Sequence, residues 1–392
     1  MSTRQHDHHD GGGGVAVEPA ATDDLRRSCL NPRLLLLVCV MQCYLILCLL
    51  VYINPTLTTR TVNGIEPLTS SIPLTVRQLG ETETRAPRPR YESNHTTILV
   101  WRWPYGQYSG PIDCRNVLNI DGCSITTDRS TYHKAHGVVF HHKDTVLNLG
   151  DMPTLQRPFF QKWVWMNFES PTNSPKSSQI ENMFNLTCTY RADSDIPVPY
   201  GFLVPRIPDT ETFHPPPKDK LICWVISNYN PDHARSKYYQ ELSSHIDIHV
   251  YGNAAGYHIP NDQFMPLLAS CKFYLAFENS IHVDYITEKL YKPLLAGSVP
   301  IVLGATRQNY EKYVPSTAFI HIHDYNSVSD LATHIHMLDK NRMLYLNYFQ
   351  WKRYHNVHVT KWWETPICRI CANIKTHTES KTIPSINEWF WI

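Results

Sequence analysis

The 392-residue sequence predicts an α/β protein in which an N-terminal transmembrane helix and a stem precede two Rossmann-like domains. Three observations predict this order: an uncharged apolar run near the N-terminus, two later series of short apolar segments, and a proline-rich segment between the series. Hydrophobic residues make up 42% of the chain, enough to bury one large core or two of ordinary domain size. The 36 basic and 35 acidic residues nearly cancel, so no general positive field exists to hold a nucleic acid.

The apolar run at residues 34–53 carries no charge and is long enough to cross a bilayer. Arginines precede it more closely than they follow it, so the positive-inside rule predicts a cytosolic tail at 1–33 and a single-pass type II topology. A cleaved signal peptide is the alternative, but the run starts late and lacks a small-residue cleavage site. Residues 54–95 are rich in Thr, Pro and Arg without an apolar period, which predicts a stem.

Seven cysteines follow the predicted anchor, and Asn-x-Thr sequons occur at Asn94 and Asn185. Both features are typical of the oxidising, glycosylating lumen of the secretory pathway. The sequence therefore predicts that the bulk of the chain is lumenal.

Two series of apolar or β-branched segments predict buried strands. The first lies at 98–101, 137–140 and 162–166, and the second at 221–226, 246–251, 271–277, 299–303 and 318–322. Helical spacing at 286–296, ended by Gly297, places a helix between two strands of the second series. This alternation predicts parallel sheets built from βαβ units. The proline-rich segment Phe213–Pro217 then predicts a hinge between domains at 96–214 and 218–365.

The densest group of polar residues surrounds the helix of the second series. Phe-Glu-Asn-Ser at 277–280 follows a predicted strand, and a loop then brings Glu288 and Lys289 to the start of the helix. Ligands of open α/β sheets bind at this carboxyl edge, where a helix N-terminus favours anions. The lysine suits a diphosphate and the glutamate suits ribose hydroxyls. From these residues alone, a solvated first helical turn is the alternative.

The motifs also occur in a specific order. They are Trp-Pro-Tyr-Gly-Gln at 103–107, Thr-Thr-Asp-Arg-Ser at 126–130, Trp-Met-Asn-Phe-Glu-Ser-Pro at 165–171, Trp-Val-Ile-Ser-Asn-Tyr-Asn at 224–230, Asp-Tyr-Ile-Thr-Glu-Lys-Leu-Tyr at 284–291 and Gly-Ser-Val-Pro at 297–300. From about residue 97 to 392 the sequence resembles the Lewis-type α-1,3-fucosyltransferase family, most closely its vertebrate fucosyltransferase 9 branch. The tail, anchor and stem are not covered by this resemblance.

The resemblance implies a GT-B type fold whose two Rossmann-like domains face a cleft, the first binding the acceptor and the second binding GDP-fucose. It implies inverting transfer of L-fucose to the 3-hydroxyl of N-acetylglucosamine in lactosamine-type (Lewis x) glycans of glycoproteins and glycolipids, in the Golgi membrane. The alternatives are another acceptor such as the N-glycan chitobiose core, another sugar nucleotide, or a non-catalytic glycan-binding protein. Such a binder has no need of Glu169, Arg235 and Lys289 together, yet all three are present.

The resemblance assigns the catalytic base to Glu169, which follows a predicted buried strand; a surface carboxylate is the alternative from the residues alone. It places Lys289 and Arg235 on the leaving diphosphate, where cations stabilise the transition state. The remaining donor-binding positions are Ser227, Asn228, Tyr251, Glu278, Asn279 and Glu288. Tyr251 is equally compatible with a place in the core.

On the acceptor side, Trp103 offers an apolar face for a galactose ring and Gln107 an amide for its hydroxyls. A Trp ring packed under the proline turn is the alternative for Trp103. Lys143 occupies the family position that is basic in enzymes for type 2 acceptors and Trp in those that also form α-1,4 bonds. A type 2, α-1,3 specificity is therefore expected, with Lys in place of the usual Arg.

The resemblance also implies disulfides that join Cys114 and Cys123 to Cys368 and Cys371, and Cys223 to Cys271, with Cys188 free. The C-terminal segment 366–392 would then pack back on the acceptor domain. Cys368-x-x-Cys371 alone is compatible with zinc or thiol redox chemistry, but no second pair at zinc spacing exists.

Asp193-Ser194-Asp195 has the Asp-x-Asp form that holds a metal–nucleotide complex in other glycosyltransferases. It lies in a polar loop on the acceptor side of the predicted hinge. Because Lys289 and Arg235 can neutralise the diphosphate, neither a metal nor a cofactor is predicted.

Overall fold

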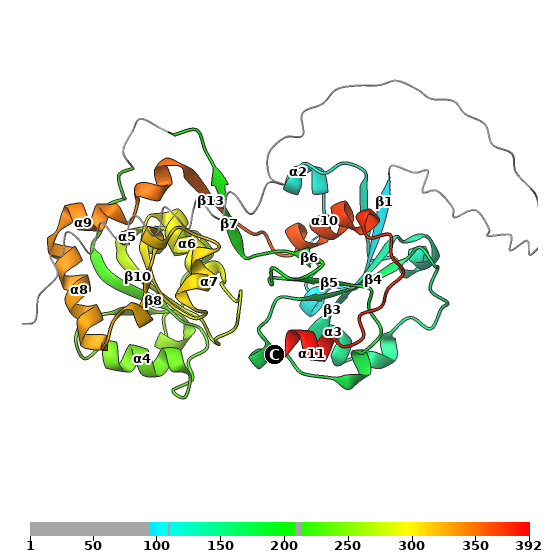
Figure 1. Ribbon diagram of the computed structural model, residues 1–392, viewed down its shortest axis with the longest axis horizontal. Coiled ribbons are helices and arrows are strands. Elements are labelled where there is room, and N and C mark those ends of the chain that lie inside the picture. Colours follow the sequence, from blue (N-terminus) through cyan, green and yellow to red (C-terminus); the bar gives the residue numbers. More distant parts are fainter. Residues whose placement is uncertain (1–94, 109, 209–212) are drawn as a thin grey trace, which may run out of the picture. The chain divides into compact units, whose positions relative to one another are not determined.

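The computed structural model describes residues 95–108, 110–208 and 213–392 (Figure 1). The described residues form one compact unit, to which every element below belongs. The predicted tail, the anchor at 34–53, nearly all of the stem and the sequon at Asn94 lie outside the described residues. Within the described residues, no helix is both long and apolar enough to cross a membrane.

The first sheet has six parallel strands in the order β2-β1-β3-β4-β5-β6. Their bounds are β1 Thr96–Arg102, β2 Cys123–Thr126, β3 Gly137–His141, β4 Lys162–Asn167, β5 Leu186–Thr189 and β6 Ile196–Pro197. The short helices α2 (Cys114–Leu118) and α3 (His142–Val146) follow β1 and β3 in the chain. Every residue of β3, β4 and β5 is buried, as expected of a parallel sheet covered on both faces.

The second sheet has five parallel strands in the order β12-β11-β10-β8-β9. The strands are β8 Lys220–Val225, β9 His249–Tyr251, β10 Cys271–Phe277, β11 Val299–Leu303 and β12 Ile320–His321. The helices are α4 Ala234–Leu242, α5 Asn261–Ser270, α6 Glu288–Ala296, α7 Arg307–Glu311, α8 Val328–Lys340 and α9 Arg342–Asn347. The prediction of two parallel α/β sheets is confirmed. In each sheet the strand order reverses once, between β1 and β3 in the first and between β8 and β10 in the second.

The connection between the sheets differs from the predicted hinge. β7 (Gly201–Pro205) pairs with β13 (His355–Val359) in a separate antiparallel ribbon, so the chain leaves the first sheet through β7 and returns through β13. Gly201 must be glycine, because a Cβ there would lie 2.4 Å from the ring of Tyr291 in α6.

The proline-rich segment Phe213–Pro217 belongs to the second domain instead. The ring of Phe213 packs on Phe349 of the second core, with 5.4 Å between ring centroids. Next to it, the amine of Lys218 donates hydrogen bonds to the carbonyls of Ala269 and Gly297, and burial lowers its pKa to about 8. Apolar packing and a buried amine therefore hold this segment on the second domain, and the predicted domain boundaries stay a prediction.

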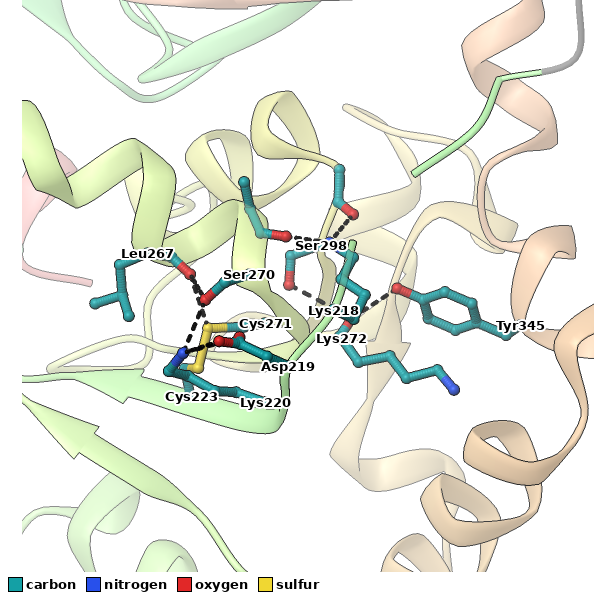
Figure 2. Close-up of a disulfide and its surroundings, with 12 residues drawn as sticks. Lys218, Asp219, Lys220, Cys223, Leu267, Ser270, Cys271, Lys272, Ser298 and Tyr345 are labelled. Atoms are coloured by element: carbon teal, nitrogen blue, oxygen red, sulfur yellow. Dashed lines mark hydrogen bonds and ion pairs between the residues drawn. A yellow bond between two sulfur atoms is a disulfide. The ribbon is translucent and has the colours of Figure 1, made fainter. Parts of the chain in front are cut away.

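The disulfide Cys223–Cys271 links β8 to β10 beside this anchored segment (Figure 2). In the same view Tyr345 of α9 donates its hydroxyl hydrogen to the carbonyl of Lys272 at 3.0 Å. These contacts stiffen the second sheet away from the carboxyl ends of its strands.

The C-terminal segment returns to the first domain, where it is drawn in red among the cyan and green elements of Figure 1. Helices α10 (Glu364–Asn373) and α11 (Ile386–Phe390) place Ile367, Ile370 and Phe390 in the same core as β1, β3 and β4. Disulfides Cys114–Cys368 and Cys123–Cys371 fasten α10 to α2 and β2, while Cys188 is free and buried. The disulfide pairs are those that the resemblance implies.

Candidate active site

Several of the predicted site residues follow the strands between which strand order reverses. Trp103–Gln107 follows β1 and Lys143 follows β3, while Ser227 follows β8 and Asn279 follows β10. Doubly wound sheets bind ligands outside the carboxyl ends of the strands at this reversal. Topology alone therefore indicates one ligand site on each sheet.

Glu169 lies two residues beyond the end of β4 and is partly exposed. Its Oε1 accepts hydrogen bonds from the backbone N–H of Ser170 at 2.8 Å and from the hydroxyl of Tyr285 at 2.7 Å. None of the described residues donates a hydrogen bond to Oε2. One carboxylate oxygen is thus held in place, and the other can accept a proton from a bound hydroxyl.

Tyr285, which the sequence analysis missed, lies in the loop after β10. Its hydrogen bond therefore connects a loop of the second sheet to Glu169. Burial above all, reinforced by Tyr200, Glu169 and Glu278, raises the pKa of the Tyr285 phenol well above its usual value. The phenol therefore stays protonated and acts as a donor to the carboxylate. The sequence signal that could have identified Tyr285 as a site residue is its position within the Asp-Tyr-Ile-Thr-Glu-Lys motif.

Two further hydrogen bonds join the same pair of loops. The hydroxyl of Ser280 lies 2.7 Å from that of Ser170, and the hydroxyl of Thr172 lies 2.7 Å from Nε2 of His282. Residues 169–172 and 280–285 therefore form one hydrogen-bonded unit, which fixes Glu169 relative to the loop that leads into α6.

Lys289 stands in the first turn of α6, whose N-cap is Thr287. Its amine lies 3.2 Å from Oε2 of Glu278, 3.5 Å from Oε1 of Glu288 and 2.9 Å from the Thr287 hydroxyl. Burial opposes the charge of this amine, but the two carboxylates outweigh burial and raise the pKa of Lys289 above its usual value. The amine is therefore a permanent cation at a helix N-terminus, where anions bind favourably.

Glu278 does not face a ligand as expected, because its side chain is only 1% exposed. Its carboxylate accepts hydrogen bonds from the backbone N–H and the hydroxyl of Thr287, as well as from Lys289. Burial raises the pKa of Glu278, although Lys289 counteracts this. We conclude that Glu278 orients Lys289, whereas Glu288, with a side chain 33% exposed, remains accessible.

Arg235 lies in the first turn of α4 and is 6% exposed. Its guanidinium donates a hydrogen bond to the carbonyl of Asn228, while its Nε is buried with no partner among the described residues. An unpaired buried N–H of this kind is costly unless a ligand satisfies it. Arg235 thus fits an anion bound at the carboxyl end of β8.

The other predicted donor residues lie at the same edge of the second sheet. Ser227 and Asn228 are exposed, and Asn279 is partly exposed with its side-chain oxygen 3.0 Å from the hydroxyl of Ser280. Tyr251 ends β9 partly exposed, in edge-on contact with Tyr257. Exposed or partly exposed polar residues therefore lie at the edge of the second sheet where Arg235 and Lys289 also lie.

On the first sheet, Trp103 does not offer an exposed face as expected. It is 7% exposed, and its ring contacts Tyr108 edge-on, with 5.0 Å between ring centroids. This burial agrees with the alternative of a packed Trp ring. Gln107 and Lys143 are exposed, and the Lys143 amine lies 5.4 Å from the ring centroid of Tyr105.

The Asp-x-Asp segment is occupied by internal contacts. Asp193 pairs with Arg191 at 2.7 Å, and Asp195 accepts hydrogen bonds from the backbone N–H and hydroxyl of Thr187. Within the described ranges, no group of three or more His, Cys, Asp or Glu side chains is arranged to hold a metal ion.

The sequon residue Asn185 is 7% exposed, and its amide hydrogen-bonds Arg157, the Trp163 N–H and the Lys381 carbonyl. Glycosylation there stays a prediction, and it has to precede the folding of this loop.

Comparison with known proteins identifies the class. Residues 93–201 match the family described as "Fucosyltransferase, N-terminal", and residues 215–389 match "Glycosyltransferase family 10 (fucosyltransferase) C-term". The chain belongs to the family 10 glycosyltransferases.

Two relatives of at least 40% identity agree with this assignment. The chain is 49% identical over 359 residues to the human 4-galactosyl-N-acetylglucosaminide 3-alpha-L-fucosyltransferase 9, with 92% of this chain and 97% of the relative covered. It is 40% identical to the Bos taurus alpha-(1,3)-fucosyltransferase 4, with 82% of this chain and 92% of the relative covered. A crystal structure of an alpha1,3-fucosyltransferase with GDP-fucose aligns with 77% of this chain and 96% of that chain, at 17% identity and a TM-score of 0.49.

Proposed function

We propose that this protein transfers L-fucose from GDP-fucose to the 3-hydroxyl of N-acetylglucosamine in lactosamine-type glycans, with inversion at the fucose carbon. The observation that carries the proposal is the hydrogen bond between Glu169 and Tyr285. It joins a carboxylate beyond β4 to the loop that delivers Lys289, so a proton acceptor and a cation site belong to one unit. The names of the relatives at 49% and 40% identity support the same donor sugar and linkage.

In this mechanism, Oε2 of Glu169 takes the proton of the acceptor 3-hydroxyl. At the same time, the oxygen of that hydroxyl forms the bond to C1 of fucose. The bond from C1 to the phosphate oxygen breaks on the opposite face, and its electron pair leaves with GDP. Lys289 and Arg235 neutralise the charge that grows on the diphosphate, the kind of stabilisation worth about 3 kcal/mol per well-placed donor. Glu278 holds the Lys289 amine in position for this role.

We further infer that the donor and acceptor meet in a cleft of GT-B type between the two sheets, with the acceptor beside Gln107 and Lys143. The apolar run at 34–53 supports a type II anchor, and the sequons and disulfides support a lumenal, Golgi-resident catalytic part. The diphosphate is met by Lys289 and Arg235, so the mechanism requires no metal ion.

The direct test is an acceptor panel assayed with labelled GDP-fucose and the full-length chain in detergent. We expect transfer to N-acetyllactosamine, little transfer to its β1,3-linked isomer, and an α-1,3 linkage in the product by NMR. Addition of EDTA is expected to leave the rate unchanged. Transfer to the chitobiose core of N-glycans alone, or fucose found at another hydroxyl, would refute the proposed acceptor.

A further inference from the structure

Tyr105 has a backbone conformation that L-residues rarely adopt. In the turn after β1 it has φ 54° and ψ 19°, in the left-handed region, which costs an L-residue about 1–2 kcal/mol. A bulky aromatic residue keeps such a conformation only where its surroundings enforce it, and these positions cluster at functional sites.

Contacts around Tyr105 enforce this conformation. Its backbone N–H donates a hydrogen bond to Oδ2 of Asp144 at 2.9 Å, and the same oxygen lies 2.5 Å from Nδ1 of His141. Because His141 belongs to β3 and Asp144 to α3, the turn after β1 is tied across the point where strand order reverses. The strain therefore fixes the direction in which the Tyr105 side chain points.

The ring of Tyr105 is supported by two aromatic neighbours, and the exposed side chain of Lys143 lies over it. Its centroid lies 4.9 Å from that of His141 and 5.8 Å from that of Trp363, yet the residue is 46% exposed. The Lys143 amine lies 5.4 Å from the ring centroid. Burial first, and then the carboxylates of Glu169 and Asp144, raise the pKa of the phenol, in keeping with a ring close to the proposed base.

Since Trp103 is buried, Tyr105 is the residue of the Trp-Pro-Tyr-Gly-Gln turn that can present an aromatic face at this edge of the sheet. We propose that Tyr105 is the platform on which the galactose ring of the acceptor stacks, in the place where the exposed side chain of Lys143 lies over the ring. The C–H groups on one face of galactose suit an aromatic ring. This role rests on the proposed function. Galactose is linked to N-acetylglucosamine at the hydroxyl adjacent to the 3-hydroxyl, which faces the base Glu169 in the proposed mechanism.

The test measures KM for N-acetyllactosamine, for free N-acetylglucosamine and for GDP-fucose with the full-length chain. Tyr105→Ala is expected to raise the lactosamine KM about tenfold while the other two KM values change little. Tyr105→Asn should match it, because Asn tolerates the left-handed backbone but has no ring. Tyr105→Phe should stay within about twofold of the wild type. Tyr354→Ala, which replaces an exposed tyrosine just before β13, serves as the matched control.

Each outcome decides between a platform and a structural role. A Tyr105→Asn enzyme with wild-type KM values would show that only the backbone matters, and equal losses for free N-acetylglucosamine would show a general distortion; either result overturns the platform. Saturation-transfer NMR with N-acetyllactosamine and GDP reports binding without turnover. A wild-type chain that binds the disaccharide through Tyr105 but transfers no fucose would refute the proposed function and leave the platform intact.

Discussion

The two disulfides that hold α10 are predicted to stabilise the fold in a strongly non-additive way. Cys114–Cys368 closes 254 residues and Cys123–Cys371 closes 248. Either bridge acting alone removes chain entropy worth about 5 kcal/mol in the unfolded state. Once one bridge exists, however, the other closes a loop of only about a dozen residues, worth about 3 kcal/mol.

To test this prediction, both cysteines of one bridge, of the other bridge, or of both bridges are replaced by serine in the full-length chain. Loss of either bridge should lower the free energy of unfolding by about 3 kcal/mol, and loss of both by about 8 kcal/mol, which exceeds the total stability of many proteins. Removal of Cys223–Cys271, which closes a loop of 48 residues, should cost about 4 kcal/mol. The shorter loop is thus predicted to matter more than either long one.

The assay is urea denaturation in detergent, followed by tryptophan fluorescence and by residual fucosyl transfer. The first core contains Trp163 and Trp165, so fluorescence reports on the domain that the two parallel bridges hold. We expect the single-bridge variants to remain folded and active with lower urea midpoints, and the variant without both bridges to be inactive. A single-bridge variant as unstable as the variant lacking both would refute the parallel-loop reasoning.

Three substitutions test the site directly. Glu169→Gln should retain GDP binding while turnover falls by about two to four orders of magnitude, measured by calorimetry and initial rates; near wild-type turnover would remove Glu169 from the mechanism. Lys289→Ala should weaken donor binding and lower kcat together, because the diphosphate is charged before transfer and becomes more charged during it. A change confined to the KM for the acceptor would contradict the placement of Lys289 on the diphosphate. Tyr285→Phe removes one hydrogen bond to the Glu169 carboxylate, worth about 1.5–3 kcal/mol. The kcat should therefore fall about tenfold or more, while the KM for GDP-fucose stays unchanged. An unchanged kcat would show that the hydrogen bond from Ser170 suffices to hold Glu169.

Much of the architecture was predictable because its strands are buried on both faces. Continuous apolar runs such as 271–277 and 299–303 became β10 and β11 with the predicted bounds. β5 was missed because its sequence, Leu-Thr-Cys-Thr, is short and half polar and is buried only by its neighbours. β7 and β13 were missed for a similar reason, since their pairing depends on a contact between segments about 150 residues apart, which no local pattern reveals.

The site was predictable as a set of residues but not as a geometry. The motifs singled out Glu169, which lies beyond β4, and Arg235 and Lys289, which lie in the first turns of α4 and α6. Burial, however, decides which of them a ligand reaches, and burial depends on packing. Glu278 proved to be an internal partner of Lys289, and Trp103 a packed ring.

The ribbon of β7 and β13 also determines when each part of the protein can fold during synthesis. The second domain is a continuous stretch, whereas the first needs both residues 96–197 and the helices that end at Phe390. A chain emerging from N- to C-terminus can therefore complete its second domain first, although that domain is encoded later. The first sheet must wait, with its apolar strands uncovered and Cys114 and Cys123 unpaired, until α10 and α11 have been synthesised. A truncation before Cys368 is therefore expected to leave unfolded the domain that was synthesised first, because it removes the partners of Cys114 and Cys123.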